Sequence, residues 1–167
     1  MANTNRTDVK ITASKQAIDF LYEKFENCND GKYPNEGDTP HLADVFGADA
    51  ELYIDKIGSK WITIYDYMTN SDTEFEVSFE SAWYPPSDLL KEMHRQLVAI
   101  DPDVIFTARY WDEGYDPIGV LKITDAGQYL TLETEPDEEE DEFEGEFYWD
   151  EVIDPAFERL EKELDIK

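Results

Sequence analysis

The sequence predicts an α+β protein built around an antiparallel sheet. In the segment 74–83, phenylalanine and valine alternate with glutamate and serine, and a period of two is typical of a strand with one buried face. Two other segments, 15–27 and 88–100, place apolar side chains on one stripe at helical spacing. Hydrophobic residues make up 41% of the 167 residues and aromatic residues 14%, which is enough for one domain with a substantial core.

The first elements expected along the chain are a short strand at 7–12 and a helix at 15–27. Ser14 is the expected N-cap of this helix, because its hydroxyl can accept a hydrogen bond from an unpaired backbone N–H. The apolar stripe of the helix consists of Ile18, Leu21, Tyr22 and Phe25. Residues 29–47 are rich in Asn, Asp, Gly and Pro, and they predict a loop with at most one helical turn.

A hairpin is expected next. Residues 60–68 are rich in β-branched and aromatic side chains, 70–72 form a turn, and the strand at 74–83 follows. Pro85 and Pro86 end this hairpin, because proline cannot donate a backbone hydrogen bond to a sheet.

A second helix and three further strands complete the predicted sheet. Ser87 is the expected N-cap of a helix at 88–100. The apolar stripe of that helix consists of Leu89, Met93, Leu97 and Ile100. Segments 104–111 and 118–124 are expected to pair across a turn, and 129–132 to add a short strand.

The order strand, helix, strand, strand, helix, strand is the split β-α-β order of ferredoxin-like folds. We therefore expect a ferredoxin-like core at 1–132, an acidic segment at 133–151, and a C-terminal helix within 152–167 that docks on the core to give a single domain. Asp154 is the expected cap of that helix, and Pro155 its first residue. Its apolar stripe consists of Phe157, Leu160 and Leu164.

Several short motifs support a resemblance to a known family. They are IGSKW at 57–61 before a strand, FESAWYPP at 79–86 before a helix, and ARYWDEG at 108–114 before Ile118 and Gly119. In this order they resemble the YubB-type ferredoxin-like family of phage and plasmid proteins, over roughly residues 8–128. The resemblance implies a ferredoxin-like fold and a mobile-element setting, and it implies no catalytic residues. The acidic segment and the last helix lie outside it.

The charge of the chain is strongly negative. It has 41 Asp and Glu against 14 Lys and Arg, a formal net charge of −27. Between Glu133 and Glu151, twelve of nineteen residues are acidic and none is basic. Such a polyanion repels nucleic acid and anionic membranes and is attracted to basic clefts such as those that bind DNA. The expected partner is therefore a basic protein.

Three interpretations of the acidic segment stay open. It can be a docking surface, a solvated linker, since blocks of like charge usually repel themselves, or one part of a generally acidic surface of halophilic type. Aromatic residues interleave its carboxylates, namely Phe143, Phe147, Tyr148 and Trp149, and such side chains favour burial. The helix that follows tethers its second end. Both features favour a docking surface over a linker.

No catalytic or metal-binding pattern stands out in the sequence. Cys28, His41 and His94 are the only cysteine and histidines, and their spacing does not match a zinc site. Glu140 to Glu151 carries acids in the register of a calcium-binding loop, but glutamates replace the usual aspartates. We therefore expect no enzyme, cofactor or metal. The single cysteine and the lack of a signal core or membrane span predict a cytoplasmic protein of the infected or host cell.

The expected function is that of a phage- or plasmid-encoded inhibitor. It would act as a polyanionic mimic of nucleic acid on a basic DNA- or RNA-binding site of a host protein, with CRISPR or restriction machinery as the target class that the resemblance suggests. The alternative is an acidic interaction or assembly module without mimicry, and an enzyme that uses paired carboxylates is a third class. Neither nucleic acid nor membrane is an expected partner, and the oligomeric state stays open.

The expected partner-binding residues include three glutamates on the solvent face of the strand at 74–83, where they would also repel phosphate. A charged face that only keeps the sheet soluble is the alternative for these three. The full set is Glu74, Glu76, Glu80, Glu135, Asp137, Glu138, Glu139, Glu140, Asp141, Glu142, Phe143, Glu144, Glu146, Phe147 and Trp149.

Overall fold

The computed structural model describes residues 3–28, 62–115, 117–135 and 149–166. Its strands are β1 (Thr4–Thr12), β2 (Thr63–Ser71), β3 (Glu74–Ala82), β4 (Ile105–Asp112), β5 (Ile118–Ile123) and β6 (Tyr129–Thr134). Its helices are α1 (Lys15–Cys28), α4 (Ser87–Val98) and α6 (Asp154–Glu163), and the short π-helical turn η2 (Trp149–Ile153) leads into α6.

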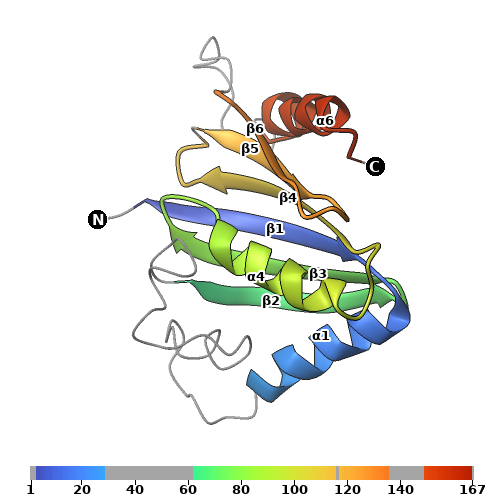
Figure 1. Ribbon diagram of the computed structural model, residues 1–167. Helices are drawn as coiled ribbons and strands as arrows, with labels where there is room; N and C mark the ends of the chain where they lie inside the picture. Colours follow the sequence, from blue (N-terminus) through green and yellow to red (C-terminus); the bar gives the residue numbers. More distant parts are fainter. Residues whose placement is uncertain (1–2, 29–61, 116, 136–148, 167) are drawn as a thin grey trace.

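The six strands form one sheet in the order β2-β3-β1-β4-β5-β6 (Figure 1). Every pair of neighbouring strands is antiparallel. The first four strands, with α1 after β1 and α4 after β3, form the split β-α-β core. The predicted α+β, ferredoxin-like fold with a C-terminal helix is confirmed. The strands β5 and β6 extend this core beyond β4.

Helices α1 and α4 cover one face of the sheet and enclose the main core. The strands contribute their alternate residues to it, and the helices contribute the apolar stripes that the sequence predicts. Among the completely buried members are Ile11, Leu21, Phe25, Phe75, Phe79, Leu90, Met93, Leu97 and Phe106. Each such side chain contributes about 1.5–3 kcal/mol by leaving water, so this layer supplies most of the stability.

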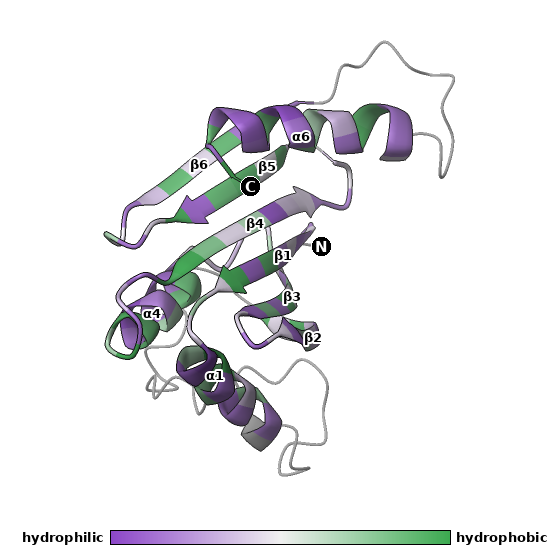
Figure 2. Cartoon of the chain, turned by 90° about the vertical axis from the view of Figure 1, so that its right-hand side faces the viewer, coloured by the Kyte–Doolittle hydropathy of each residue, from purple (hydrophilic) through white to green (hydrophobic). Residues whose placement is uncertain are grey.

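Helix α6 covers the opposite face, over β5 and β6. Figure 2 shows α1 and α4 grouped together, with α6 apart from them beside these two strands. Ile118 and Val120 of β5 form a second buried cluster with Phe157 and Leu160 of α6. The other alternate residues of β5 face the main core, so this strand is buried on both faces. The open sheet face is therefore free of helices only over β1 to β4, among the residues that the structure describes.

Two predicted helix caps are wrong. Ser87 is the first residue of α4 rather than its cap, and no side chain caps that helix. Asp154 does not cap α6, because the turn η2 runs directly into the helix and leaves Ile153 at the N-cap position. The carboxylate of Asp154 accepts a hydrogen bond from Arg109 instead, at 3.0 Å. A helix that continues from a preceding turn has no exposed first N–H groups for a side chain to cap.

Candidate functional site

The acidic segment leaves the sheet after β6 and returns at η2. Of the predicted partner-binding residues, Glu74, Glu76, Glu80, Glu135 and Trp149 are described by the structure. The others, at 137–147, lie outside the described residues, so their predicted role stays a prediction. The described part nevertheless shows how both ends of the segment are held.

The first end is held by a hydrogen bond that crosses a strand. Tyr110 of β4 lies opposite Gly119 of β5, which lies opposite Glu133 of β6. The Tyr110 hydroxyl donates to Glu133 Oε1 at 2.7 Å. Burial, and then this hydrogen bond, raise the pKa of Tyr110 well above its ordinary value. The phenol therefore stays protonated and keeps its bond to the first acid of the segment.

The second end is held by an aromatic cluster. The Trp149 ring lies edge-on to Trp111 and Tyr115, with centroids 5.2 and 5.6 Å apart, and tilted against Phe157 at 6.3 Å. Trp149 is half-buried in these contacts. These contacts hold the second end of the segment against β4 and α6, and the predicted contact of Trp149 with a partner stays a prediction.

Helix α6 is clamped onto the sheet by Arg109. Its Nε and Nη2 donate to the two carboxylate oxygens of Glu161 at 2.7 and 2.9 Å, and its Nη1 donates to Asp154. The guanidinium also lies 5.1 Å from the centroid of the Phe157 ring. The hydrogen bonds to Glu161 raise the pKa of Arg109. This forked geometry is the strong form of an arginine–carboxylate pair.

The open sheet face carries charges of both signs. Glu76 and Glu80 lie opposite Lys10 and Arg6 of β1, and Lys10 bonds Glu74 at 2.8 Å. The three glutamates therefore do not form a purely acidic face. The alternation of β1 contains the signal that sequence reasoning missed, because it places both basic residues on the face that β3 shares.

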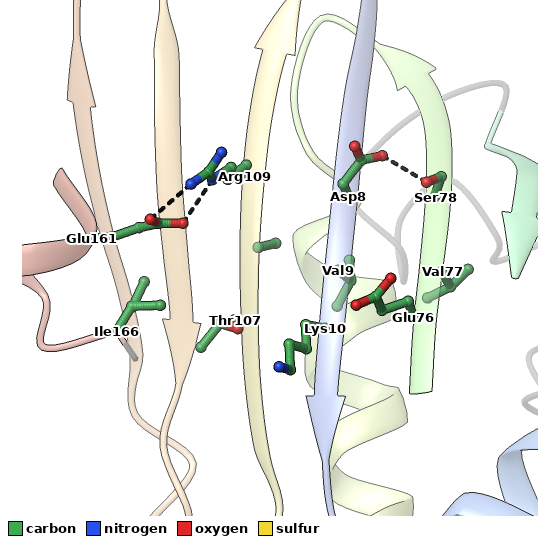
Figure 3. Close-up of a pocket in the computed structure, with 11 residues that line it drawn as sticks. Asp8, Val9, Lys10, Glu76, Val77, Ser78, Thr107, Arg109, Glu161 and Ile166 are labelled. Atoms are coloured by element: carbon green, nitrogen blue, oxygen red, sulfur yellow. Dashed lines mark hydrogen bonds and ion pairs between the residues drawn. The ribbon is translucent and has the colours of Figure 1, made fainter. Parts of the chain in front are cut away.

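Two hollows adjoin on this face between β3 and the C-terminal end of α6, with volumes of about 340 and 310 Å³. Figure 3 shows Asp8, Glu76, Arg109 and Glu161 around the first, with the Asp8 carboxylate turned toward Ser78. The Ser78 hydroxyl donates to Asp8 at 2.6 Å. Carboxylates, cations and the hydroxyls of Ser78 and Thr107 line this surface.

The described residues contain no group of three or more His, Cys, Asp or Glu side chains that could hold a metal ion. His94 has a structural place, since it is 3% exposed and its Nε2 donates to the Val104 carbonyl oxygen at 3.1 Å. Within the described part of the chain, no helix combines the length and the apolar character needed to cross a bilayer.

Exposed aromatic side chains occur beyond the acidic segment. Tyr65, Trp83 and Tyr84 are 61%, 48% and 67% exposed. Tyr65 lies on β2 at the open face, where the Arg6 guanidinium stands 4.2 Å from its ring centroid. Aromatic and arginine side chains are enriched in protein interfaces, so this edge of the sheet is a second candidate surface.

Fold and surface together define a ferredoxin-like protein with an acidic segment anchored at both ends. Residues 64–152 match the family model described as "Ferredoxin-like domain in Api92-like protein". The match spans β2 to β6 and reaches η2, which is just over half of the 167 residues. The chain therefore belongs to this family. No curated protein and no solved structure matches it.

Proposed function

We propose that this protein is a non-enzymatic inhibitor that occupies the nucleic-acid-binding site of a basic host protein as a polyanionic mimic. The observation that carries the proposal is the anchored acidic segment. Twelve acids in nineteen residues are attached to the sheet through Glu133 at one end and Trp149 at the other. An anchored segment loses less conformational entropy on binding than a free linker does, and this favours a docking role.

Charge spacing supports mimicry if the segment is compact. Twelve charges on nineteen residues would stand about 2.4 Å apart in a helix and about 5 Å apart in an extended chain, against about 1.7 Å along duplex DNA. Exposed carboxylates of Asp150, Glu151 and Glu158 continue the negative charge onto η2 and α6. Such a surface would compete with phosphates for Lys and Arg side chains.

The setting follows from the resemblance to YubB-type phage and plasmid proteins. A protein of a mobile element gains from blocking host defence, and restriction or CRISPR-type enzymes have basic nucleic-acid grooves that a polyanion would fill. This part of the proposal depends on the resemblance alone. The cytoplasm of the host cell is the compartment in which such targets work.

The experiment is capture from a nuclease-treated bacterial lysate, followed by displacement. Nuclease treatment removes nucleic acid that could bridge two proteins. We expect the captured protein to be a nucleic-acid-binding one, to be released by added duplex DNA, and to bind more weakly as salt rises. A captured protein that stays bound in excess DNA would contradict mimicry. The inhibitor itself should give no electrophoretic shift with DNA or RNA.

A second candidate function is an assembly or regulatory module without mimicry. The exposed Tyr65, Trp83 and Tyr84 favour it, because they would give an interface that is mainly apolar. Its binding would change little with salt and would not compete with DNA. The displacement experiment therefore separates the two functions.

A further inference from the structure

A trough crosses the open sheet face beside α6. The two adjoining hollows share Lys10, Thr107 and Ile166, so they form one continuous depression along β1. Glu161 and Ile166 form one wall, and Glu74 and Glu76 of β3 form the other. From Asp8 to Thr12 the strand rises about 13 Å, which is the length of about two turns of a helix.

The trough exists because α6 is narrow relative to the sheet. A helix is about 10 Å wide and strands lie about 4.8 Å apart, so one helix covers two strands. Helix α6 covers β5 and β6 and is fixed there by Arg109 and by Lys122, which donates to the Leu164 and Asp165 carbonyl oxygens at 3.3 and 2.7 Å. Beyond the Arg109 and Trp111 side chains of β4, which contact α6, no described helix covers the open face over β1.

The trough lacks an available cation but has an available carboxylate. Lys10 bonds Glu74, Arg109 bonds Glu161, and Lys122 bonds the end of α6. The Glu76 carboxylate, by contrast, makes no hydrogen bond or ion pair with any residue that the structure describes. A ligand that binds in the trough is therefore expected to carry a positive charge that can pair with the Glu76 carboxylate.

We infer that the trough receives about two turns of a basic helix from the partner protein, with a Lys or Arg directed at Glu76. An extended segment is a poorer occupant, because β1, β3 and β4 are paired on both sides and offer no backbone groups to a further strand. A second copy of the chain is disfavoured by the net charge of −27 on each molecule. The inference rests on the proposed function, since it assigns to the same basic partner a second contact outside the acidic segment.

The test uses a synthetic alanine-based helical peptide with lysines at i and i+4, titrated into the full chain. Peptide affinity is followed by fluorescence anisotropy, and amide chemical shifts report the location. Glu76→Lys should weaken binding about tenfold. The matched control is Glu23→Lys, which makes the same change of charge at an exposed site on α1 that contributes to neither surface, and it should weaken binding less than about twofold. Glu76→Gln removes the negative charge without placing a lysine opposite Lys10. Its peptide affinity should lie between those of Glu76→Lys and Glu23→Lys.

Changes in amide chemical shift confined to residues 8–12, 74–78, 105–109 and 161–166 would support the trough. Equal effects of Glu76→Lys and Glu23→Lys, shift changes confined to 133–151, or no peptide binding would overturn it. If charge reversal in the acidic segment removes inhibition but Glu76→Lys weakens neither peptide binding nor binding of the captured partner, the trough fails and the mimic stands. If Glu76→Lys removes peptide binding but DNA does not displace the captured partner, the trough is supported and the proposed mimicry of nucleic acid is contradicted. Self-association of the chain that Glu76→Lys abolishes would make a second copy the occupant and would overturn the inference.

Discussion

Tyr110 on β4 donates a hydrogen bond to Glu133 on β6 although the whole of β5 lies between them. The phenol ring reaches across because the residue opposite it on β5 is Gly119, which has no side chain in the way. A Cβ atom at Gly119 would stand 2.2 Å from Tyr110 Cζ. The sheet thus uses one glycine to attach the first residue of the acidic segment to a buried tyrosine.

Gly119→Ala should destabilise the fold by about 1–3 kcal/mol through overpacking. The Tyr110 side chain is 1% exposed, so its ring cannot move aside easily. Urea unfolding measures the loss. In a Tyr110→Leu background, where the ring is absent, the same substitution should cost clearly less, since neighbouring sites couple. If the losses of unfolding free energy from Gly119→Ala and Tyr110→Leu simply add in the double variant, the close approach of Gly119 to the Tyr110 ring would be contradicted.

Stability should fall at alkaline pH because of Tyr129. Burial, and then the charges of Asp88 and Glu133, raise the pKa of Tyr129 to about 12 from its ordinary value of 10.0. The protonated phenol therefore favours the folded state, and its contribution is complete below pH 10 and is lost as pH rises from about 10 to about 12. The loss should be about 2 kcal/mol.

The free energy of unfolding, measured at several pH values in this window, checks that expectation. Tyr129→Phe removes the titrating group and should give a shallower decline, while Tyr110, with a pKa raised in the same direction, still contributes. Identical declines for the two proteins would rule out the assignment to Tyr129.

Asp165→Gly should stabilise the protein by about 1 kcal/mol. Asp165 follows α6 with a φ of 52°, a left-handed conformation that glycine adopts at lower cost. Its N–H donates to the Lys162 carbonyl oxygen and that of Ile166 to the Glu161 carbonyl oxygen, the two bonds of a Schellman motif. Asp165→Ala removes the same charge but keeps the backbone cost. A melting temperature for the alanine variant equal to that of the glycine variant would show that charge, rather than backbone, decides.

Arg109→Lys should loosen α6. Lysine keeps the positive charge but cannot form the forked pair with Glu161, so we expect a loss of about 1–2 kcal/mol and faster amide exchange in α6. Arg159→Lys is the control, because Arg159 is exposed on the same helix and makes one long hydrogen bond, to Thr134 at 3.4 Å. Equal exchange in the two variants would contradict the clamp.

Local sequence patterns predict the elements of this fold well, and relationships between strands less well. The alternation of β3 and the apolar stripes of α1 and α4 follow from burial on one face, so their positions could be inferred within a few residues. The order of these elements then predicts the sheet, since few topologies accommodate it.

Contacts between distant residues could not be inferred in the same way. Nothing local to Arg109 indicates that it pairs with Glu161, or that Asp154 joins this pair instead of capping a helix. The mixed charge of the open face could not be inferred from the sequence of β3 alone, because it depends on the register of β1 against β3. The contacts of Trp149 with Trp111 and Tyr115 could not be inferred either, because its neighbours in the sequence are acidic and these rings come from other segments.

The most direct test of the proposed mimicry is charge reversal within the acidic segment. The variant carries lysine at Glu138, Glu139, Asp141 and Glu142, and the measurement is its ability to displace duplex DNA from the captured host protein. We expect displacement to be abolished while the melting temperature stays the same or rises, because reversal relieves repulsion between like charges. Full displacement by this variant at an unchanged melting temperature would contradict the proposal and leave the acidic segment as a solvated surface.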